Sequence, residues 1–527
     1  MPKAGTDGAD GAAVRLAELV ALLSLGTDLG LGQPMEHMIR ACLIALRLGE
    51  SAALEDSERG VVYYSGLLAW VGCHTDAYEQ AKWLGDDLAA KLDAHYGYDL
   101  GKAGPAAAFV VKHLGGAGTP FLQRARIGAS FLGDGRRALA AMAVNHYLAA
   151  DELAAGLGLS EQVRASLRQS YERWDGKGPL GLRGDQIAIS SRLINLADVV
   201  EVFRRTGGVD AAIAVARERS GTQFDPDLVE VFCQRARLIF DDVDAAARWD
   251  LVIESEPSLA TVVGGAELDE ALAAIGEFAE LKSPWLMGHA RGVAELAAEA
   301  GQSLSLPRGD VSALRRAAFV HDIGRLGVSN AIWDKPAALT RSELERVRLH
   351  PYLTERMLSF SPSLAPLGAS AGQHHERLDG SGYPRGLSGD AIGTAGRVLA
   401  AADSYHALTQ ARPYRPPRPA ADAAAQLRAE VAAGRMDGAA VDAVLRAAGH
   451  RVRRRREWPA GLTAREVEIV RLLARGLTVK GIARQLVISP KTAGNHVEHI
   501  YAKTGVSNRA QLSVFAMRHA LMAEADL

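Results

Sequence analysis

Histidine and aspartate residues gather in three short fragments of the chain. The first is His321-Asp322-Ile323-Gly324-Arg325, the second runs from His374 to Pro384, and the third ends at Asp403. Imidazole and carboxylate groups are ligands for hard or borderline divalent metals. Because apolar segments of helical character lie between the fragments, the pattern predicts a metal cluster inside a helical bundle.

The candidate metal ligands form an ordered set in which each residue is expected to face inward from a helix. They are His289, His321, Asp322, His350, His374, His375 and Asp403. The capping box Thr340-Arg341-Ser342-Glu343 is expected to begin the helix that carries His350. A single histidine beside apolar residues is more often an ordinary core residue than a metal ligand. The prediction of a metal site therefore rests on the seven residues taken together and not on any one of them. Asp322 could bridge two cations, which together would activate a water for attack on phosphorus.

The ordered set resembles the HD-GYP subfamily of HD-domain metal-dependent phosphohydrolases, strongly over residues 283–450. The resemblance rests on the three fragments, on His350-Pro351, and on the runs Asp403 to Leu408 and Arg412 to Arg415. It implies an all-helical fold, two or three metal ions, often iron or manganese, and hydrolysis of the messenger cyclic di-GMP to the linear dinucleotide or GMP. The expected catalytic residues are Asp322 and Arg325. The expected substrate-binding residues are Arg325, Gly382, Tyr383, Pro384, Arg412 and Arg415.

Three positions depart from the pattern of that family. Arg325 stands where a lysine is usual; it keeps the positive charge and can grip phosphate through two N–H groups, but its shape differs. Trp285 stands where a glutamate would bind a third metal, so two divalent ions, manganese or iron, are expected. His406 replaces a usual aspartate, with an effect that the sequence does not indicate.

The segment from His146 to Arg204 repeats the segment from His350 to Leu408. Residues 171–178 match residues 375–382, and His146 lies 24 residues before Ser170, as His350 lies 24 before His374. Most ligand positions are changed in this first copy: Ser170 and Tyr171 replace the paired histidines, and the His-Asp dipeptide falls near Gly72-Cys73. Residues 14–240 are therefore interpreted as a degenerate copy, structural or sensory, whose remaining histidines are ordinary core residues.

The charge distribution separates the C-terminal tail from the rest of the chain. Residues 451–527 hold 14 Lys and Arg against 6 Asp and Glu, a balance of +8, so the other 450 residues carry 46 against 56, a balance of −10. A basic tail on an acidic body is typical of a nucleic-acid-binding module joined to another function. The three cysteines, far apart, indicate neither a disulfide framework nor a zinc site.

The tail itself follows the helix-turn-helix plan. Thr463 to Glu466 is a capping box, Gly476 ends the first helix, and Ser489-Pro490 begins a helix through Thr504, followed by a fourth helix from Arg509 through Met522. In this plan the second helix of the helix-turn-helix pair, here the one that begins at Ser489-Pro490, lies in the major groove of DNA. The predicted DNA-binding residues are Lys491, Thr492, Asn495, His496, Lys503 and Arg509. The alternative is a small helical bundle that binds protein.

Residues 460–525 closely resemble the LuxR-type DNA-binding domain. The resemblance rests on Leu462 to Glu466, Gly476 to Thr478, Ile488 to Thr492 and Lys503 to Val506. It implies that the protein binds promoter DNA as a homodimer on inverted half-sites.

Together these features predict an all-α protein with two tandem HD-like bundles and a four-helix C-terminal domain. The predicted parts are a loose tail (1–13), the degenerate copy (14–240), a connector (241–282), the HD-GYP domain (283–450), a basic linker (451–459) and the DNA-binding domain (460–525). No apolar run is long enough for a membrane span. The three widely separated cysteines favour a reducing compartment, so a cytoplasmic location is expected. The predicted function is a transcription regulator that hydrolyses or senses a cyclic dinucleotide. The alternatives are a non-catalytic nucleotide sensor and a phosphohydrolase acting on another nucleotide phosphodiester.

Overall fold

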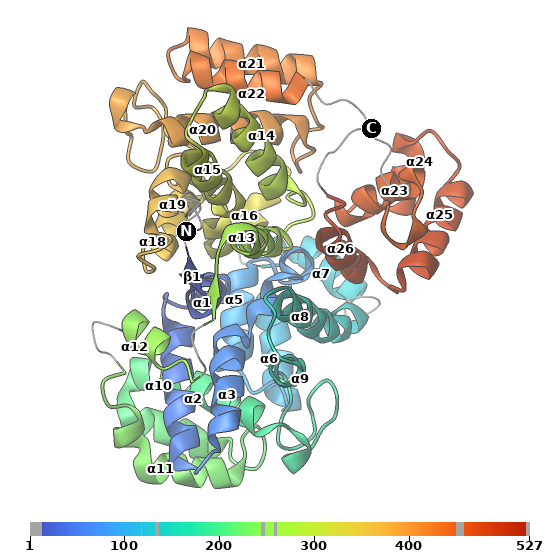
Figure 1. Cartoon of the computed structure of the whole chain (residues 1–527). Helices are drawn as coiled ribbons and strands as arrows, with labels where there is room; N and C mark the ends of the chain where they lie inside the picture. The colour runs from blue at the N-terminus through green and yellow to red at the C-terminus, as the bar shows by residue number, and fades with distance from the viewer. Residues whose placement is uncertain are drawn as a thin grey trace, which may run out of the picture. The chain divides into compact units, whose positions relative to one another are not determined.

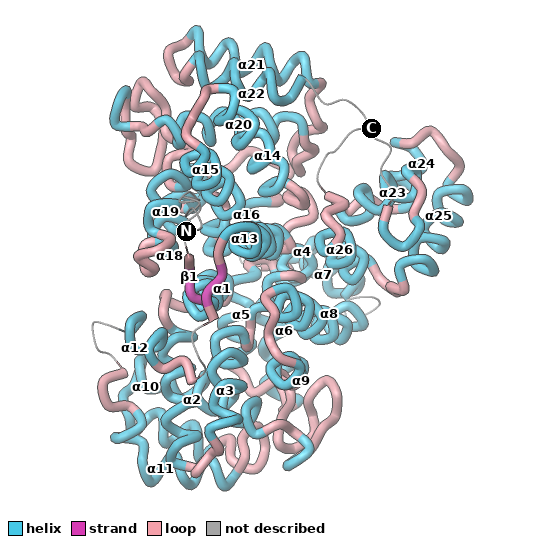
Figure 2. Tube along the Cα trace, viewed as in Figure 1, coloured by secondary structure: helices cyan, strands magenta, loops and turns pink. Residues whose placement is uncertain are grey.

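The structure is a computed structural model, and it describes residues 13–116, 119–131, 136–243, 248–257, 261–449 and 458–522. Nearly all of the predicted tail (1–13) and most of the basic linker (451–459) lie outside the described residues. Within the described ranges the chain folds into α-helices, and its two short strands, β1 (Val14–Arg15) and β2 (Val262–Val263), pair with each other (Figures 1 and 2). The all-α prediction is confirmed.

The chain divides into two compact units, of which the first, here called the N-terminal unit, comprises Arg15–Thr261 with Leu326–Trp333. Its central helix is α10 (Ile189–Glu218), kinked at Gly208, which packs against α2 (His37–Ser51), α3 (Asp56–Leu68) and α11 (Pro226–Ile239). The other helices and turns are α1 (Leu16–Gly30), η1 (Val71–His74), α4 (Ala77–Leu84), α5 (Asp87–Leu92), η2 (Asp93–Gly97), α6 (Ala103–His113), α7 (Phe121–Ser130), α8 (Arg136–Gly156), α9 (Glu161–Arg168), η4 (Gly184–Gln186), α12 (Arg248–Glu254) and α16 (Asn330–Trp333).

The second unit, here called the C-terminal unit, comprises the described residues within Met1–Val14, Val262–Arg325 and Asp334–Leu527. Its first part is a bundle, here called the second bundle, of α13 (Gly265–Glu280), α14 (His289–Ser303), α15 (Arg308–Val320), η5 (Ile323–Gly327), α17 (Arg341–Arg348), α18 (His350–Leu358), α19 (Ala365–Ala371), η6 (Gly389–Ala391), α20 (Thr394–Thr409), α21 (Ala420–Ala432) and α22 (Gly438–Gly449). Its second part, the C-terminal domain, contains η7 (Pro459–Gly461), α23 (Ala464–Ala474), α24 (Val479–Gln485), α25 (Pro490–Thr504) and α26 (Arg509–Arg518).

The core of the second bundle is built around α14 and α20. Apolar residues of α14 recur at helical spacing, and the helix packs against α15, α20 and α22. The middle of α20, from Val398 to Asp403, is buried on all sides. A helix that is apolar all round belongs in a core, so the one carboxylate in this run, Asp403, must find partners there.

The helix that carries His350 begins later than predicted. The capping box is present, because the Thr340 hydroxyl accepts the Glu343 N–H and the Glu343 carboxylate accepts the Thr340 N–H, but the helix that it begins, α17, ends at Arg348. A separate helix, α18, begins at His350. Pro351 explains the break, because proline has no N–H to donate and its ring excludes the preceding helical turn.

The last helix is shorter than predicted. We expected it to run from Arg509 through Met522, but α26 ends at Arg518. Ala520 has a φ of 50°, and the backbone N–H of Leu521 returns to Ala516 O at 2.7 Å. Such a left-handed residue with a returning hydrogen bond ends a helix. The other capping predictions for this domain, at Thr463 and Ser489, are confirmed.

Two loops, one in each unit, share one hydrogen-bonding plan. The buried Glu172 carboxylate accepts backbone N–H groups eight and ten residues further along the chain, at 2.7 and 2.8 Å. The buried Glu376 carboxylate accepts N–H groups nine and eleven residues further along, at 2.8 and 2.9 Å. The second loop is therefore one residue longer than the first and closed in the same way.

A close backbone approach also occurs once in each unit. A Cβ on Gly72 would lie 2.1 Å from the carbonyl oxygen of His146, and a Cβ on Gly324 would lie 2.1 Å from that of His350. Only glycine allows such an approach. Since His146 and His350 hold equivalent positions in the sequence repeat, Gly72 is the counterpart of Gly324, and Ala69 and Trp70 then correspond to the His-Asp dipeptide.

Candidate metal centre

The seven predicted ligands come together in the second bundle, and most of them stand at helix ends. His289 and His350 are the first residues of α14 and α18, and His321 caps α15. His374 and His375 lie in the turn after α19, so the expected inward-facing helix position holds only for Asp403, within α20. A helix end places a side chain where several elements converge, and one cluster therefore draws on five segments.

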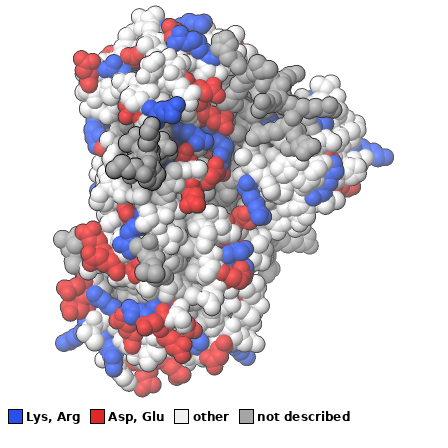
Figure 3. All heavy atoms as spheres, in the orientation of Figure 1, with Lys and Arg blue, Asp and Glu red and all other residues white. Residues whose placement is uncertain are grey.

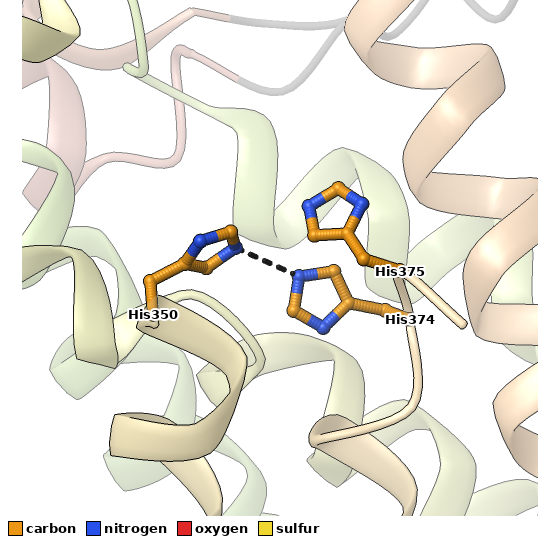
Figure 4. Close-up of side chains that lie close together, drawn as sticks. All are labelled: His350, His374 and His375. Carbon is orange, nitrogen blue, oxygen red and sulfur yellow. Dashed lines mark hydrogen bonds between the residues drawn. The ribbon is translucent and has the colours of Figure 1, made fainter. Parts of the chain in front are cut away.

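Three histidines form the first of two groups that could hold a metal ion: His350, His374 and His375. Their rings face one another in Figure 4, and the Nε2 atoms of His350 and His374 are 3.2 Å apart. The first two side chains are fully buried and the third is slightly exposed. Three imidazoles whose nitrogen atoms lie this close together could bind one metal ion of the kind that prefers imidazole ligands.

The second group consists of His289, His321 and Asp322. The Asp322 carboxylate lies between the two groups: Oδ2 is 3.4 Å from His321 Nε2, whereas Oδ1 is 3.3 Å from His350 Nε2. Asp403 has a similar place, with Oδ1 3.0 Å from His289 Nε2 and Oδ2 4.0 Å from His375 Nδ1. Two carboxylates thus face both groups, which is the arrangement that a pair of nearby cations requires.

Backbone carbonyls orient three of the imidazoles. Nδ1 of His321, of His350 and of His374 each lies 2.6–2.7 Å from the carbonyl oxygen three residues earlier in the chain. Each Nδ1 therefore carries a proton and donates it, and Nε2 is the ring nitrogen directed at the cluster. Metal-binding histidines typically have such a second hydrogen bond.

The electrostatics of the cluster fit a bound cation. Burial opposes the charge of Asp322, but Arg325 and His321 outweigh it and hold the pKa of that carboxyl well below its usual range. Burial lowers the pKa of His350 to about 4, so its imidazole is neutral near pH 7 and free to donate a lone pair. Two buried atoms of the cluster, His321 Nε2 and Asp322 Oδ1, make no hydrogen bond. Buried polar atoms are rarely left so, and a metal ion would satisfy both.

Two arginines from the predicted substrate site lie beside the cluster. Arg325, in η5, places Nε 2.7 Å from Asp322 Oδ2. Burial and the charge of Arg325 lower the pKa of Arg412 to about 10, and its guanidinium donates to the Trp285 carbonyl. Arg415 differs, because its guanidinium donates to the carbonyls of Ala407, Leu408 and Gln410 at the end of α20. Its contacts are those of a residue that closes a helix end.

Gly382-Tyr383-Pro384, predicted to bind substrate and here called the lip, lies against the first group of histidines. The Tyr383 ring stacks on His375 with centroids 4.7 Å apart, and the Arg348 guanidinium lies 5.7 Å from the Tyr383 ring. A Cβ on Gly382 would lie 2.4 Å from the Arg377 backbone nitrogen. The lip can fold against its own base only with glycine at this position.

Sequence reasoning missed the roles of two residues near the centre. His406 lies with Nδ1 2.9 Å from Nδ1 of His289, on the side of that ring facing away from Asp403. Glu376 is the buried carboxylate that closes the lip loop. The sequence does show that His406 is three residues after Asp403, on the next turn of the same helix, and this spacing could have indicated a second contact near the ligands.

The equivalent place in the N-terminal unit holds a network of side chains. His37 Nε2 lies 2.9 Å from Asp198 Oδ1, and the Tyr96 hydroxyl lies 3.0 Å from both atoms. On its other side, His37 Nδ1 is 2.5 Å from Glu201 Oε2. Burial opposes protonation, but Glu201 and Asp198 raise the pKa of His37 to about 10, so its ring is a cation near pH 7. Among the described residues, both groups that could hold a metal ion belong to the second bundle.

The predicted DNA-binding residues differ in how free their side chains are. Lys491, Thr492 and Asn495 are exposed on α25, and His496 is half-buried. Lys503 places Nζ 2.7 Å from Glu466 Oε2 and 3.2 Å from Gly461 O, so it ties α25 to the start of the domain. Arg509 is the half-buried first residue of α26.

The surface charge follows the division seen in the sequence. On the face drawn in Figure 3, Asp and Glu side chains crowd the region around α10 and α11, whereas Lys and Arg side chains are visible over α25. The C-terminal domain thus presents positive charge on the helix that the helix-turn-helix plan assigns to DNA.

Two family models match the chain. "HD domain" matches residues 274–440, and "Bacterial regulatory proteins, luxR family" matches residues 460–516. No helix among the described residues is long and apolar enough to cross a membrane.

Curated relatives and a solved structure cover most of the chain. A 3'3'-cGAMP-specific phosphodiesterase 3 of Vibrio cholerae is 33% identical over 409 residues, covering 77% of this chain and 88% of that protein. A cyclic di-GMP phosphodiesterase of Thermotoga maritima is 37% identical over 158 residues, covering 30% of this chain and 43% of that protein. The crystal structure of a cyclic GMP-AMP-specific phosphodiesterase of V. cholerae superposes with a TM-score of 0.57 at 27% identity, covering 83% of this chain and 98% of that one.

Proposed function

We propose that this chain, which belongs to the HD-GYP family of metal-dependent phosphohydrolases and ends in a luxR-type DNA-binding domain, hydrolyses a 3',3'-linked cyclic dinucleotide and regulates transcription. The observation that carries the proposal is the pair of ligand groups joined by the Asp322 and Asp403 carboxylates. DNA binding as a homodimer on inverted half-sites accords with the exposed polar face of α25. We assign this activity to the cytoplasm, where promoter DNA is found.

The metal centre is proposed to hold two divalent cations, manganese or iron. Five imidazoles and two carboxylates form a donor set that suits these metals better than magnesium, which prefers oxygen ligands alone. His350, His374 and His375 would hold one ion, and His289, His321 and Asp403 the other, with Asp322 between them. When bound, the two ions would supply an activated water and offset negative charge on the phosphoryl group.

The remaining chemistry belongs to side chains of this chain. We assign to Arg325 and Arg412 the binding of the phosphate oxygens, because both guanidinium groups are held beside the cluster and stay charged. Tyr383, stacked on His375, would form the wall against which the dinucleotide lies. We assign Arg415 no direct contact with substrate, because its guanidinium donates to the carbonyls that end α20.

Two cyclic dinucleotides are candidate substrates. The sequence resemblance implied cyclic di-GMP, and the short match to the T. maritima enzyme is in line with it. The relative that matches over most of its length is specific for 3'3'-cGAMP. We therefore propose that both are tested together, with 3'3'-cGAMP as the favoured substrate.

The N-terminal unit is proposed to be a copy of the second bundle that has lost its metals. Its Glu172 loop and its Gly72 contact repeat those of the second bundle. In the register set by Gly72 and Gly324, Trp70 takes the place of Asp322 and Cys73 that of Arg325. The bridging carboxylate and the phosphate-binding cation are both absent from the first copy, so we assign it no catalytic role.

The test is a hydrolysis assay on the purified full chain loaded anaerobically with manganese or iron. We expect linear dinucleotide from 3'3'-cGAMP, no product from Asp322→Ala, and none from His374→Ala. The matched control is Ser170→Ala, which changes the equivalent position of the first copy and should retain full turnover. Failure of the wild type to form product with either metal, or unchanged product with Asp322→Ala, would refute the enzyme. Saturable binding of the dinucleotide without product would favour the non-catalytic sensor.

A further inference from the structure

A cavity of about 490 Å³ lies inside the N-terminal unit. Aromatic and aliphatic side chains form most of its wall, among them Trp70, Tyr98, Phe109 and Tyr171. The Trp70 and Tyr171 rings meet edge to face with centroids 5.1 Å apart. Ligand sites are typically concave and apolar, with a few placed polar groups, and this volume is within their usual range of about 300–1,000 Å³.

The lysine and arginine side chains of the cavity wall already have carboxylate partners. Lys91 Nζ lies 3.1 Å from Asp87 Oδ2, and Arg173 Nη1 lies 3.0 Å from Asp99 Oδ1. Lys177 is paired with a carboxylate at 3.5 Å. A phosphate placed here would have to displace one of these carboxylates, so the wall is better matched to an uncharged ligand.

One of the two histidines in the wall, His95, is neutral. Burial lowers the pKa of His95 to about 4, and its ring packs against Trp70 with centroids 4.9 Å apart. It thus adds to the wall a flat, uncharged ring.

Five polar atoms in the wall are buried and make no hydrogen bond, and three of them also have no ionic partner. These three are Trp70 Nε1, Gln80 Oε1 and His146 Nδ1. The residues that carry them are 5%, 8% and 7% exposed. Trp70 offers an N–H donor and Gln80 an acceptor. Leaving a buried polar group without a hydrogen bond costs about 1–3 kcal/mol of free energy. A ligand that accepts from Trp70 Nε1–H and donates an N–H to Gln80 Oε1 would remove both costs and bind more tightly.

From these features we propose that the cavity binds an uncharged, planar heteroaromatic molecule, of the size of a purine nucleoside or a substituted quinoline, with an acceptor and an N–H on its edge. Its ring would lie among the aromatic side chains, where planar rings pack edge to face or offset. The cavity occupies the place that the metal site would have in this copy, since Trp70 stands in the position of Asp322 and Ser170 and Tyr171 in those of the paired histidines. The N-terminal unit would then be a ligand-binding module, and this binding is independent of turnover at the metal centre.

The test measures binding of three neutral probes, guanosine, adenosine and quinolin-4-ol, to the full chain by calorimetry and by tryptophan fluorescence. Ala106 lines the cavity from α6, whereas its neighbour Ala107 is exposed and outside the wall. We expect Ala106→Trp to fill the cavity and weaken binding at least about tenfold, and Ala107→Trp, which adds the same side chain outside the cavity, to bind like the wild type. Only the binding component that Ala106→Trp removes is assigned to the cavity.

Two further measurements keep the proposal open to refutation if the filled variant folds poorly. Gln80→Leu removes an acceptor that has no partner in the protein, so the variant should be at least as stable as the wild type and yet bind the probe about tenfold more weakly. Adenosine 5'-monophosphate should bind in the cavity at least about tenfold more weakly than adenosine. The proposal is overturned if none of the neutral probes binds saturably up to about 1 mM. Equal binding by the two tryptophan variants, or by adenosine and its monophosphate, overturns it as well.

Discussion

Gly324 holds the two halves of the metal centre together, and its replacement gives a prediction that can be worked out from the structure. A Cβ at this position would lie 2.1 Å from the His350 carbonyl oxygen, 2.7 Å from Thr354 N and 2.9 Å from Thr354 Oγ1. Ordinary contact begins at 3.4 Å, so Gly324→Ala must move η5 and the start of α18 apart by about 3.4 − 2.1 = 1.3 Å. Asp322 is in the segment before this glycine and His350 is the first residue of α18, so the displacement acts directly on the contact between the two ligand groups.

The displacement exceeds what a metal site tolerates. Ligand distances in a good site lie within about 0.2 Å of their ideal values, so a shift of about 1 Å should release one of the two ions. An error of about 1 Å in a reacting group can cost about 100-fold in rate. We therefore expect Gly324→Ala to hold about one metal per chain by mass spectrometry and to hydrolyse the dinucleotide at least about 100-fold more slowly. The overpacking itself should cost about 1–3 kcal/mol of stability.

The N-terminal unit supplies a matched control for this change. Gly72→Ala produces the same 2.1 Å contact, with His146 O, in a unit to which we assign no metal. It should lower the unfolding temperature by a similar amount and leave metal content and rate unchanged. At Gly309, a helical position, an added Cβ would have no neighbour within 4 Å. Gly309→Ala should therefore leave the unfolding temperature, the metal content and the rate unchanged. A Gly324→Ala protein that keeps both metals and turns over within about threefold of the wild type would refute the geometric argument.

Four further changes test separate parts of the chain. Arg325→Lys should leave metal content unchanged and lower turnover by about tenfold, because it keeps the charge and loses the two-pronged grip; loss of metal would contradict the assigned role. Glu376→Gln should raise the KM and expose its loop to proteolysis, since an amide nitrogen cannot accept the N–H that the carboxylate accepts, and Glu172→Gln is the control that spares KM. His37→Gln should destabilise the N-terminal unit by about 3 kcal/mol at pH 6, by chemical denaturation. Because the folded pKa of His37 is raised to about 10, that stabilisation is complete below pH 6.5 and declines toward pH 10, so the difference from the wild type should narrow there. Lys491→Ala should reduce the slope of log affinity against log salt for promoter DNA by about 0.9, and an unchanged slope would argue against a phosphate contact.

The sequence predicted which residues form the candidate metal centre better than it predicted the helices and loops that carry them. Spacing and residue type were enough to choose seven side chains that lie together in the fold, and their role as metal ligands stays a prediction. The helix boundaries were less predictable. His350 was assigned to the helix that begins at the Thr340 capping box, but that helix ends at Arg348 and Pro351 begins a new one with His350. The role of Glu376 could not be predicted, since its partners are backbone N–H groups that converge only in the folded loop.

In the first copy, too, the sequence could not predict the contacts that depend on tertiary structure. The sequence indicated which ligands it lacks, but not that Tyr96, from a π-helical turn 102 residues before Asp198, places its hydroxyl between His37 and Asp198. Nor did it reveal the cavity beside Trp70, because lining residues come from many separate segments. Likewise the free charge of Lys491 and the paired charge of Lys503 look alike in sequence, and only the contact with Glu466 separates them.

A single position on the central helix of each unit shows how the two copies differ in their need for a cation. Three residues after the buried aspartate, α10 carries Glu201 and α20 carries His406, and each contacts Nδ1 of the histidine that faces that aspartate. Glu201 adds a negative charge, so His37 is held as a cation, and the buried Asp198 needs no metal. His406 adds no such charge, and burial lowers the pKa of His289 to about 4, so His289 is neutral and the charge of Asp403 remains to be balanced. An ionised carboxylate buried beside neutral imidazoles is costly unless a cation completes the site. Burial opposes protonation of His321, but Asp322 and Asp403 raise its pKa to about 9, so this ring supplies one positive charge, and we propose that metal ions supply the rest. The N-terminal unit carries its own positive charge on His37.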